Sequence, residues 1–155
     1  MPMPTDEELR AYETTPERVV AALEGRSDAQ LHSAPGVDEW SIHEIVIHLA
    51  DSDMFGSERL RRTIAEERPT LQAYPEAAWA QRLLYRQQDR QLALDLFTAQ
   101  RRATAALLRL LPAEAWERVG VHSEQGNTNL YALFKMYLQH GNIHLAQIEH
   151  VKERL

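Results

Sequence analysis

Two histidines near the C-terminal end of the chain, His140 and His144, have the spacing of ligands to a single metal ion. Residues four apart on a helix lie one turn above each other on the same face, so two imidazoles so placed can converge. At about 100° per residue they share a face with Leu133, Tyr137 and Ile148. The pattern predicts either a metal site or a pair of hydrogen-bonded core histidines, and the spacing alone leaves both open.

The supply of further ligands is restricted, because the 155 residues contain no cysteine. Any transition metal must then be held by histidine, aspartate or glutamate. His48 is the favoured third ligand, since it falls in the middle of a predicted long helix on the side of Ile45 and Phe55. His43 lies in the first turn of that helix on a different face, which makes it the less favoured alternative. Three histidines would leave a metal position open for water, as catalytic sites do.

The remaining histidines and one glycine carry separate expectations. His150 lies opposite the apolar face and is expected in solvent, while His32 lies in a connector, where solvent or a loop hydrogen bond is expected. His122 lies in the loop 120–126 before the last helix. Loops at the mouth of a bundle often present reactive groups, so His122 is the candidate catalytic acid or base, with an ordinary loop histidine as the alternative. Gly141, inside a helix at a cost of about 1 kcal/mol, predicts close approach of another helix or a ligand.

Helix start and stop signals predict an all-α chain without strand-like alternation beyond a few residues. Capping boxes at Thr5 and Ser41 open the first two helical regions, and Thr15-Pro16 gives a second start within the first. The predicted long helices cover about 5–25, 42–67, 90–111 and 130–155. Short helices at 77–84 and 112–116 are expected, with a mixed connector over 69–88 and a loop over 119–128. Four long helices predict a bundle with functional groups projecting into its interior.

The third long helix, capped by Asp89, has an apolar stripe that is expected to face the bundle. The stripe consists of Leu92, Leu96, Ala99, Ala103, Ala106, Leu107 and Leu110. The basic clusters at 59–62 and 101–102 are expected to be solvated helix faces.

Composition limits the class of protein and its partners. With 44% hydrophobic and 26% charged residues, the chain is expected to form one domain over residues 1–155. The net charge of −6 argues against a nucleic-acid partner. The first ten residues have no apolar signal segment, and the longest stretch free of charge, 136–148, contains glutamine, asparagine and histidine. Neither secretion nor a membrane is expected, so a cytoplasmic location is the default.

Three parts of the chain together resemble one family. Residues 40–53, Trp-Ser-Ile-His-Glu-Ile-Val-Ile-His-Leu-Ala-Asp-Ser-Asp, are similar to the opening W-S-x-x-E-x-x-x-H-L-x-D-x-E of the DinB-like (DNA-damage-inducible) metalloenzymes. Residues 140–148 resemble the closing H-x-x-x-H-L-x-Q-I of that family. Segments 74–80, 97–101 and 116–126 are similar to the middle of one of its branches. The resemblance spans about residues 15–151.

The resemblance implies a four-helix bundle with a long crossover, described as up-down-down-up, and a divalent metal held by His48, His140 and His144. Zinc or nickel are the first candidates, followed by iron, manganese or cobalt. Departures from the family pattern occur at 53, 141 and 143, where Asp, Gly and Ile replace the commoner Glu, Asp and His. None of these departures removes a ligand.

The resemblance further implies a metal-dependent hydrolase, or a transferase that uses a low-molecular-weight thiol, acting on a small-molecule substrate. The absence of cysteine fits a thiol supplied by a cosubstrate without requiring one. The alternative is a non-catalytic metal-binding module of a stress response. A path from solvent to the open side of the metal would favour the enzyme. A homodimer is also implied by the family.

Overall fold

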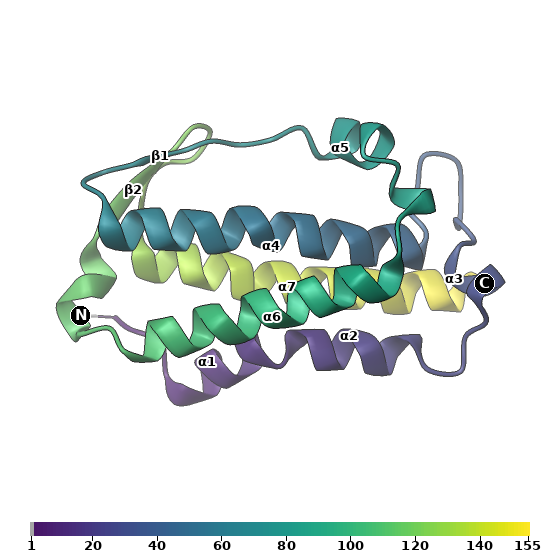
Figure 1. The fold of residues 1–155 in the computed structure, drawn as a ribbon, viewed down its shortest axis with the longest axis horizontal. Helices are drawn as coiled ribbons and strands as arrows, with labels where there is room; N and C mark the ends of the chain where they lie inside the picture. The colour runs from purple at the N-terminus through teal and green to yellow at the C-terminus, as the bar shows by residue number, and fades with distance from the viewer. Residues whose placement is uncertain (1) are drawn as a thin grey trace.

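The long helices of the computed structural model, which describes residues 2–155, run side by side as a four-part bundle (Figure 1). The first part consists of α1 (Asp6–Glu13) and α2 (Thr15–Leu23) in line with each other. It is followed by α4 (Ile42–Ala65), α6 (Arg90–Arg109) and α7 (Leu130–Glu153). Followed along the chain in Figure 1, α1 and α2 run one way, α4 and α6 both run back, and α7 returns. The predicted up-down-down-up bundle is therefore confirmed.

The long helices begin where capping side chains satisfy their first free backbone N–H groups. The hydroxyl of Thr5 accepts from the backbone of Glu8 at 3.1 Å, and the hydroxyl of Ser41 accepts from the backbone of Glu44 at 3.2 Å. In both boxes the glutamate side chain accepts in return from the backbone of the cap residue. The side chains of Asp89 and Asn129 likewise accept hydrogen bonds from backbone N–H groups in the first turns of α6 and α7.

A crossover of about two dozen residues joins the parallel helices α4 and α6 and returns along the outside of α4 (Figure 1). It contains the short strand β1 (Thr70–Leu71), the helix α5 (Glu76–Arg82) and the 3-10 turn η1 (Tyr85–Gln87). The chain also has a short helix α3 (Asp28–Leu31) before α4 and a 3-10 turn η2 (Ala113–Glu117) after α6.

The loop expected over 119–128 is instead a β-hairpin, a small addition to the helical bundle that the sequence predicts. Strand β2 (Val119–His122) pairs antiparallel with β3 (Gly126–Asn129) and parallel with β1, giving the order β1-β2-β3. Gly126 has φ +76° at the turn, a conformation that glycine adopts without strain. The parallel partner β1 lies about fifty positions earlier in the chain, so local alternation could not reveal this sheet.

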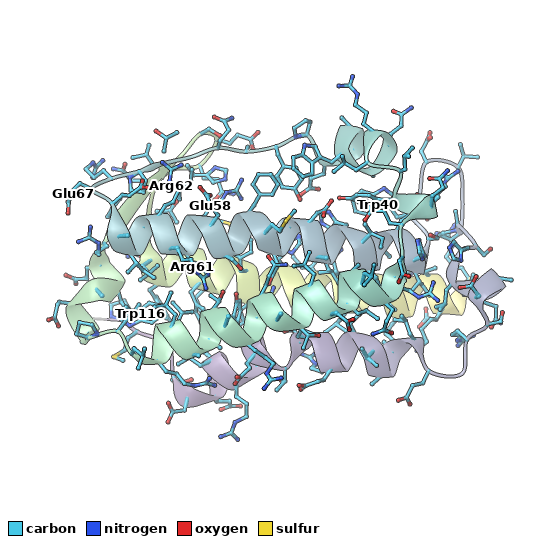
Figure 2. All side chains as sticks on the ribbon, in the orientation of Figure 1. Trp40, Glu58, Arg61, Arg62, Glu67 and Trp116 are labelled. Atoms are coloured by element: carbon cyan, nitrogen blue, oxygen red, sulfur yellow. The ribbon has the colours of Figure 1, made fainter. Side chains whose placement is uncertain are left out.

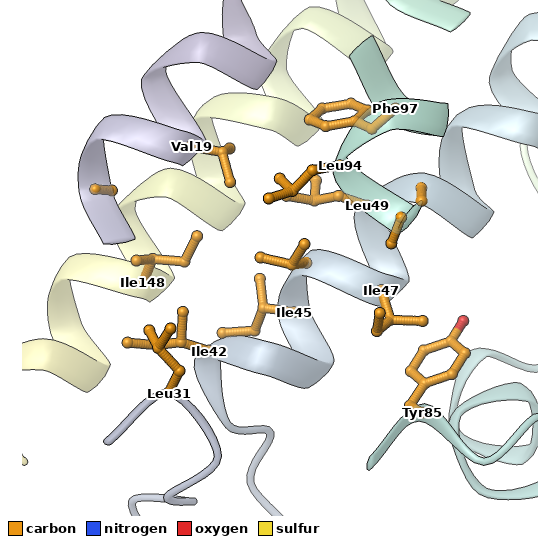
Figure 3. Close-up of a cluster of buried hydrophobic side chains, with 14 of the residues drawn as sticks. Val19, Leu31, Ile42, Ile45, Ile47, Leu49, Tyr85, Leu94, Phe97 and Ile148 are labelled. Carbon is orange, nitrogen blue, oxygen red and sulfur yellow. The ribbon is translucent and has the colours of Figure 1, made fainter. Parts of the chain in front are cut away.

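Apolar side chains fill the bundle as two clusters, one toward each end. The cluster in Figure 3 lies near the start of α4 and contains Ile45, Leu49, Phe97 and Ile148 from α4, α6 and α7. The other cluster contains Tyr12, Leu60, Leu108, Trp116, Leu133 and Phe134. Figure 2 shows Trp40 at the end where α4 begins and Trp116 at the opposite end of the bundle. Among residues 2–155, no helix has the length and apolar character needed to cross a membrane.

The prediction of which face of α6 is buried was wrong. Leu92 and Leu110 are 67% and 81% exposed, whereas the buried face carries Leu94, Phe97 and Leu108. The reason is Arg101, which is fully buried on that same face. It was expected in solvent, and its burial turns α6 away from the orientation that the leucines alone predict.

Arg101 is buried because it is paired. Its Nε and Nη2 atoms donate to the two carboxylate oxygens of Asp53 at 2.7 and 2.8 Å. Nη2 also donates to the carbonyl of Tyr137 at 3.1 Å, and the guanidinium lies 4.1 Å from the ring centre of Tyr12. Such partners offset the cost of burying its charge. Arg101 thereby connects α6 with α1, α4 and α7.

Candidate metal centre

The predicted three histidines meet inside the bundle, His48 from α4 and His140 and His144 from α7. The Nε2 atom of His140 lies 3.3 Å from Nε2 of His48 and 3.0 Å from Nε2 of His144. Ligand nitrogens bound to a tetrahedral zinc at 2.0–2.1 Å are about 3.3 Å apart. These two separations are already close to those that a shared ion requires, and the ligand atoms of all three rings lie within 4.8 Å of one another, so the group could hold a metal.

Burial keeps these rings neutral, which is the form that binds metals. It lowers the pKa of His48 to about 3 and that of His140 to about 2, and it lowers the pKa of His144 as well. The Nδ1 atom of His144 is 2.7 Å from Oε1 of Gln147. Since the amide oxygen can only accept, Nδ1 carries the hydrogen and Nε2 keeps its lone pair for an ion.

Packing fixes the orientation of His48. The ring of Trp40 lies 4.7 Å from the ring of His48, so the tryptophan that precedes the α4 cap covers this ligand. The Nδ1 atoms of His48 and His140 are buried and have no hydrogen-bond partner among the described residues. Apart from the contacts among the three Nε2 atoms, packing therefore holds these two rings.

A cavity of about 190 Å³ connects His140 to the surface between the crossover and the β-hairpin. His140 lines it together with His122, so the centre is not sealed within the bundle. This is the arrangement expected of a site that admits a substrate. The lining residues are Ser52, Arg59, Ala73, Tyr74, Glu76, His122, Glu124, Gln125, Met136, Tyr137 and His140.

His122 lies at the end of strand β2 and is only 6% exposed, rather than in an open loop. Its Nδ1 accepts from the backbone N–H groups of Glu124 and Gln125 at 3.2 and 3.3 Å. Because Nδ1 is an acceptor, the hydrogen of the neutral ring is on Nε2. Burial, and next the charge of Arg59, lower the pKa of His122. The side chain is thus a neutral hydrogen-bond donor with a fixed tautomer.

The other histidines lie away from the centre. His43 is 2% exposed, and its Nε2 donates to the carbonyl of Tyr85 at 2.9 Å while Nδ1 accepts from Arg90 at 2.9 Å. It stacks on His32, which bonds the carbonyl of Asp28 as a loop histidine can. The preference for His48 over His43 agrees with this arrangement. His150 is exposed, as expected.

Arg59 is the residue of the cavity that sequence reasoning missed. It was grouped with Arg61 and Arg62 as a solvated face, but it is only 6% exposed. The helical phase contains the signal: Arg59 follows His48 by eleven residues, which is about 20° from three full turns. A residue on the same helix face as a metal ligand is expected to point toward the same site, even when it is charged.

Comparison with known proteins identifies the family of the chain. Residues 11–148 match the DinB superfamily. The chain belongs to the DinB superfamily. It is 30% identical over 97% of its length, and 86% of the relative's, to a protein of Bacillus mycoides named provisionally as a metal-dependent hydrolase. It is 31% identical over 83% of its length, and 74% of the relative's, to a protein of Oceanobacillus iheyensis with the same provisional name.

A solved structure resembles this DinB-superfamily chain over nearly its full length. YfiT from Bacillus subtilis, described as a probable metal-dependent hydrolase with an unusual four-helix bundle topology, superposes with a TM-score of 0.89 at 26% identity. The match covers 99% of this chain and 92% of YfiT. The resemblance to this family, the bundle and its topology are therefore confirmed.

Proposed function

We propose that this protein is a metal-dependent hydrolase of small molecules, with a divalent metal held by Nε2 of His48, His140 and His144. The observation that carries the proposal is the convergence of three neutral Nε2 atoms beside a cavity that reaches the surface. Zinc or nickel are the first candidates, because imidazole suits both. The Bacillus relatives' provisional names point to the same class of reaction.

A divalent metal in such a site supplies Lewis acidity and a bound water whose pKa falls toward neutrality. The chain's own residues would bind and orient the substrate. His122 donates its Nε2 hydrogen to an oxygen of the substrate, and the two backbone donors on Nδ1 hold the ring in the required tautomer. As a neutral donor it would stabilise the negative charge that develops on that oxygen, while the leaving group would take its proton from solvent.

The metal assignment is tested by elemental analysis of the purified protein and two matched variants. His144→Ala removes a ligand, whereas His150→Ala removes an exposed histidine of the same helix. We expect about one metal per chain in the parent and in His150→Ala, and loss of metal in His144→Ala. Metal that persists unchanged in His144→Ala would refute the three-histidine site.

The reaction is tested on a panel of esters and amides with the metal-loaded protein, with and without a small thiol. Turnover without thiol supports the hydrolase, and turnover only with thiol would replace it by a thiol transferase, since the chain has no cysteine of its own. Metal binding without any turnover would favour the non-catalytic module. His122→Ala is expected to lower kcat by about 10²–10³-fold, as for the loss of one hydrogen-bond donor to a developing oxyanion. The homodimer and the cytoplasmic location stay predictions.

A further inference from the structure

Arg59 is a buried cation without a carboxylate partner. Among residues 2–155, no Asp or Glu oxygen lies within 4.0 Å of its guanidinium, which is the distance limit for an ion pair. Its neighbour Arg62, labelled in Figure 2, lies at 3.5 Å from Glu58 and 3.0 Å from Glu66. Arginine stays charged at any ordinary pH, and burying an unpaired charge is costly. The arrangement therefore calls for an anion that is not part of the chain.

The guanidinium of Arg59 is held in place by neutral groups that leave donors free. Nη1 donates to the hydroxyl of Tyr137 at 2.6 Å, and Nη2 donates to the carbonyl of Gln72. The ring of Phe55 lies 5.3 Å from the guanidinium carbon. Arginine has five N–H donors, and the Nε donor of Arg59 is buried without an acceptor. These contacts orient the cation without neutralising it.

The position of Tyr137 is itself built into the helix packing. A Cβ atom at Gly56 would lie 2.7 Å from the ring of Tyr137, so only glycine lets this ring pack directly against α4. The hydroxyl of Tyr137 is thereby brought to Arg59, one turn of α7 before the ligand His140. The anchor of the guanidinium and the metal ligand are therefore on the same rigid element.

The cavity around Arg59 is rich in hydrogen-bond donors. The hydroxyl of Tyr74 is buried without a partner, and His122 presents its Nε2 hydrogen. The cavity also has two carboxylates in its lining, Glu76 and Glu124, but both residues are exposed and neither pairs with Arg59. A volume of about 190 Å³ corresponds to about six water molecules at roughly 30 Å³ each. The occupant must therefore be small.

We propose that Arg59 binds a carboxylate of the substrate, so that the protein acts on small organic acids whose reacting group lies at the metal. This inference rests on the proposed function and names its substrate class. A carboxylate fits a planar guanidinium that keeps an N–H donor without an acceptor among the described residues. A tetrahedral phosphate can also bind arginine, so inorganic phosphate is the competing anion in the test. Arg59 is then the residue that determines specificity, and the metal centre performs the reaction.

The test measures binding rather than turnover, so that it does not depend on the metal. Succinate and its uncharged analogue succinamide are titrated calorimetrically into metal-free and metal-loaded protein. We expect succinate to bind both forms and succinamide to bind at least tenfold more weakly. Arg59→Gln is expected to weaken succinate binding by roughly 10- to 100-fold. Arg62→Gln, the same charge change three residues away, should leave binding unchanged.

Two further measurements keep the result interpretable if Arg59→Gln unfolds. Arg59→Lys preserves the charge and should retain part of the affinity. In the parent protein, the Nε–H resonance of Arg59, assigned by its loss in Arg59→Lys, should shift as succinate is added.

Equal binding of succinate and succinamide, no shift of that resonance, or tighter binding of inorganic phosphate would overturn the proposal. A chain that binds succinate through Arg59 but takes up no metal would contradict the proposed function instead. The two failures are therefore distinguishable.

Discussion

Removing Asp53 should destabilise the whole bundle, because it leaves Arg101 as an uncompensated charge in the interior. The two side chains are 1% and 0% exposed and share two hydrogen bonds of 2.7 and 2.8 Å. Breaking a buried pair from one side costs about 3–5 kcal/mol, out of about 5–15 kcal/mol for a whole domain. At about 2–4 °C per kcal/mol for a chain of this size, Asp53→Leu should lower Tm by about 6–20 °C.

The assay is urea unfolding followed by circular dichroism, with three variants in a double-mutant cycle. Asp53→Leu and Arg101→Met should each be strongly destabilised, and the double variant should be more stable than either, because it buries no charge. Asp95→Leu, an exposed aspartate on α6, is the control and should change stability by under about 0.5 kcal/mol. A loss below about 1 kcal/mol in Asp53→Leu, or costs that simply add in the double variant, would refute the reasoning.

The same perturbation should reach the metal centre. Arg101 bonds the carbonyl of Tyr137 at 3.1 Å, three residues before His140, and Asp53 follows His48 by five residues on α4. The pair thus links the two helices that carry the ligands. We expect Asp53→Leu to weaken metal binding even under conditions where it stays folded, which a competition titration with a chelator measures.

Three other substitutions have defined outcomes in the same unfolding assay. Gly141→Ala should destabilise by about 1–3 kcal/mol despite its better helix propensity, because the new Cβ would lie 2.8 Å from the buried methyl of Thr15; a more stable variant would contradict this packing. Ser41→Ala should cost about 1 kcal/mol by removing the cap of α4, and an unchanged urea midpoint would argue against the cap. Burial raises the pKa of Asp51, although the hydroxyl of Tyr85 donates a hydrogen bond to its carboxylate. The protonated Asp51 therefore contributes fully to stability below the pKa of the unfolded chain. This contribution is lost as the pH rises through the pKa of the folded protein. Asp51→Asn should therefore gain stability relative to the parent at pH 7 and not at pH 3, and equal differences at both values would contradict the shift.

Helical phase was enough to predict the parts of the site that lie on α7. The face containing Leu133, Phe134 and Tyr137 is buried as the sequence predicts, and it carries both His140 and His144 into the interior. Gly141 permits the expected close approach, which is made by Thr15 of α2. This face could be predicted because its buried side chains are mostly apolar, so hydrophobic periodicity and burial coincide.

The same method failed on α6 because the buried face there contains a charge. Leu92 and Leu110 predict one buried face of α6, but the structure buries the face that carries Arg101. The carboxylate that pairs with Arg101 belongs to Asp53, which lies 48 residues earlier on another helix. The β-hairpin was missed for a related reason. Its strands are four residues each, and β2 is completed by β1, whose position relative to β2 depends on the path of the crossover. Both errors arise where a distant partner, rather than the local sequence, decides burial.

Two buried arginines with different partners show which features of a buried charge the sequence can predict. Arg59 and Arg101 are both buried and both looked like members of solvated clusters. Arg101 forms an ion pair with Asp53, so its charge is neutralised within the bundle and helps to hold four helices together. Arg59 lies on the His48 face of α4, where it contacts a hydroxyl, a carbonyl and an aromatic ring, and no carboxylate of residues 2–155 lies within ion-pair distance. Phase alone places Arg59 beside the metal ligands, and only the three-dimensional contacts reveal that no carboxylate of residues 2–155 forms an ion pair with it.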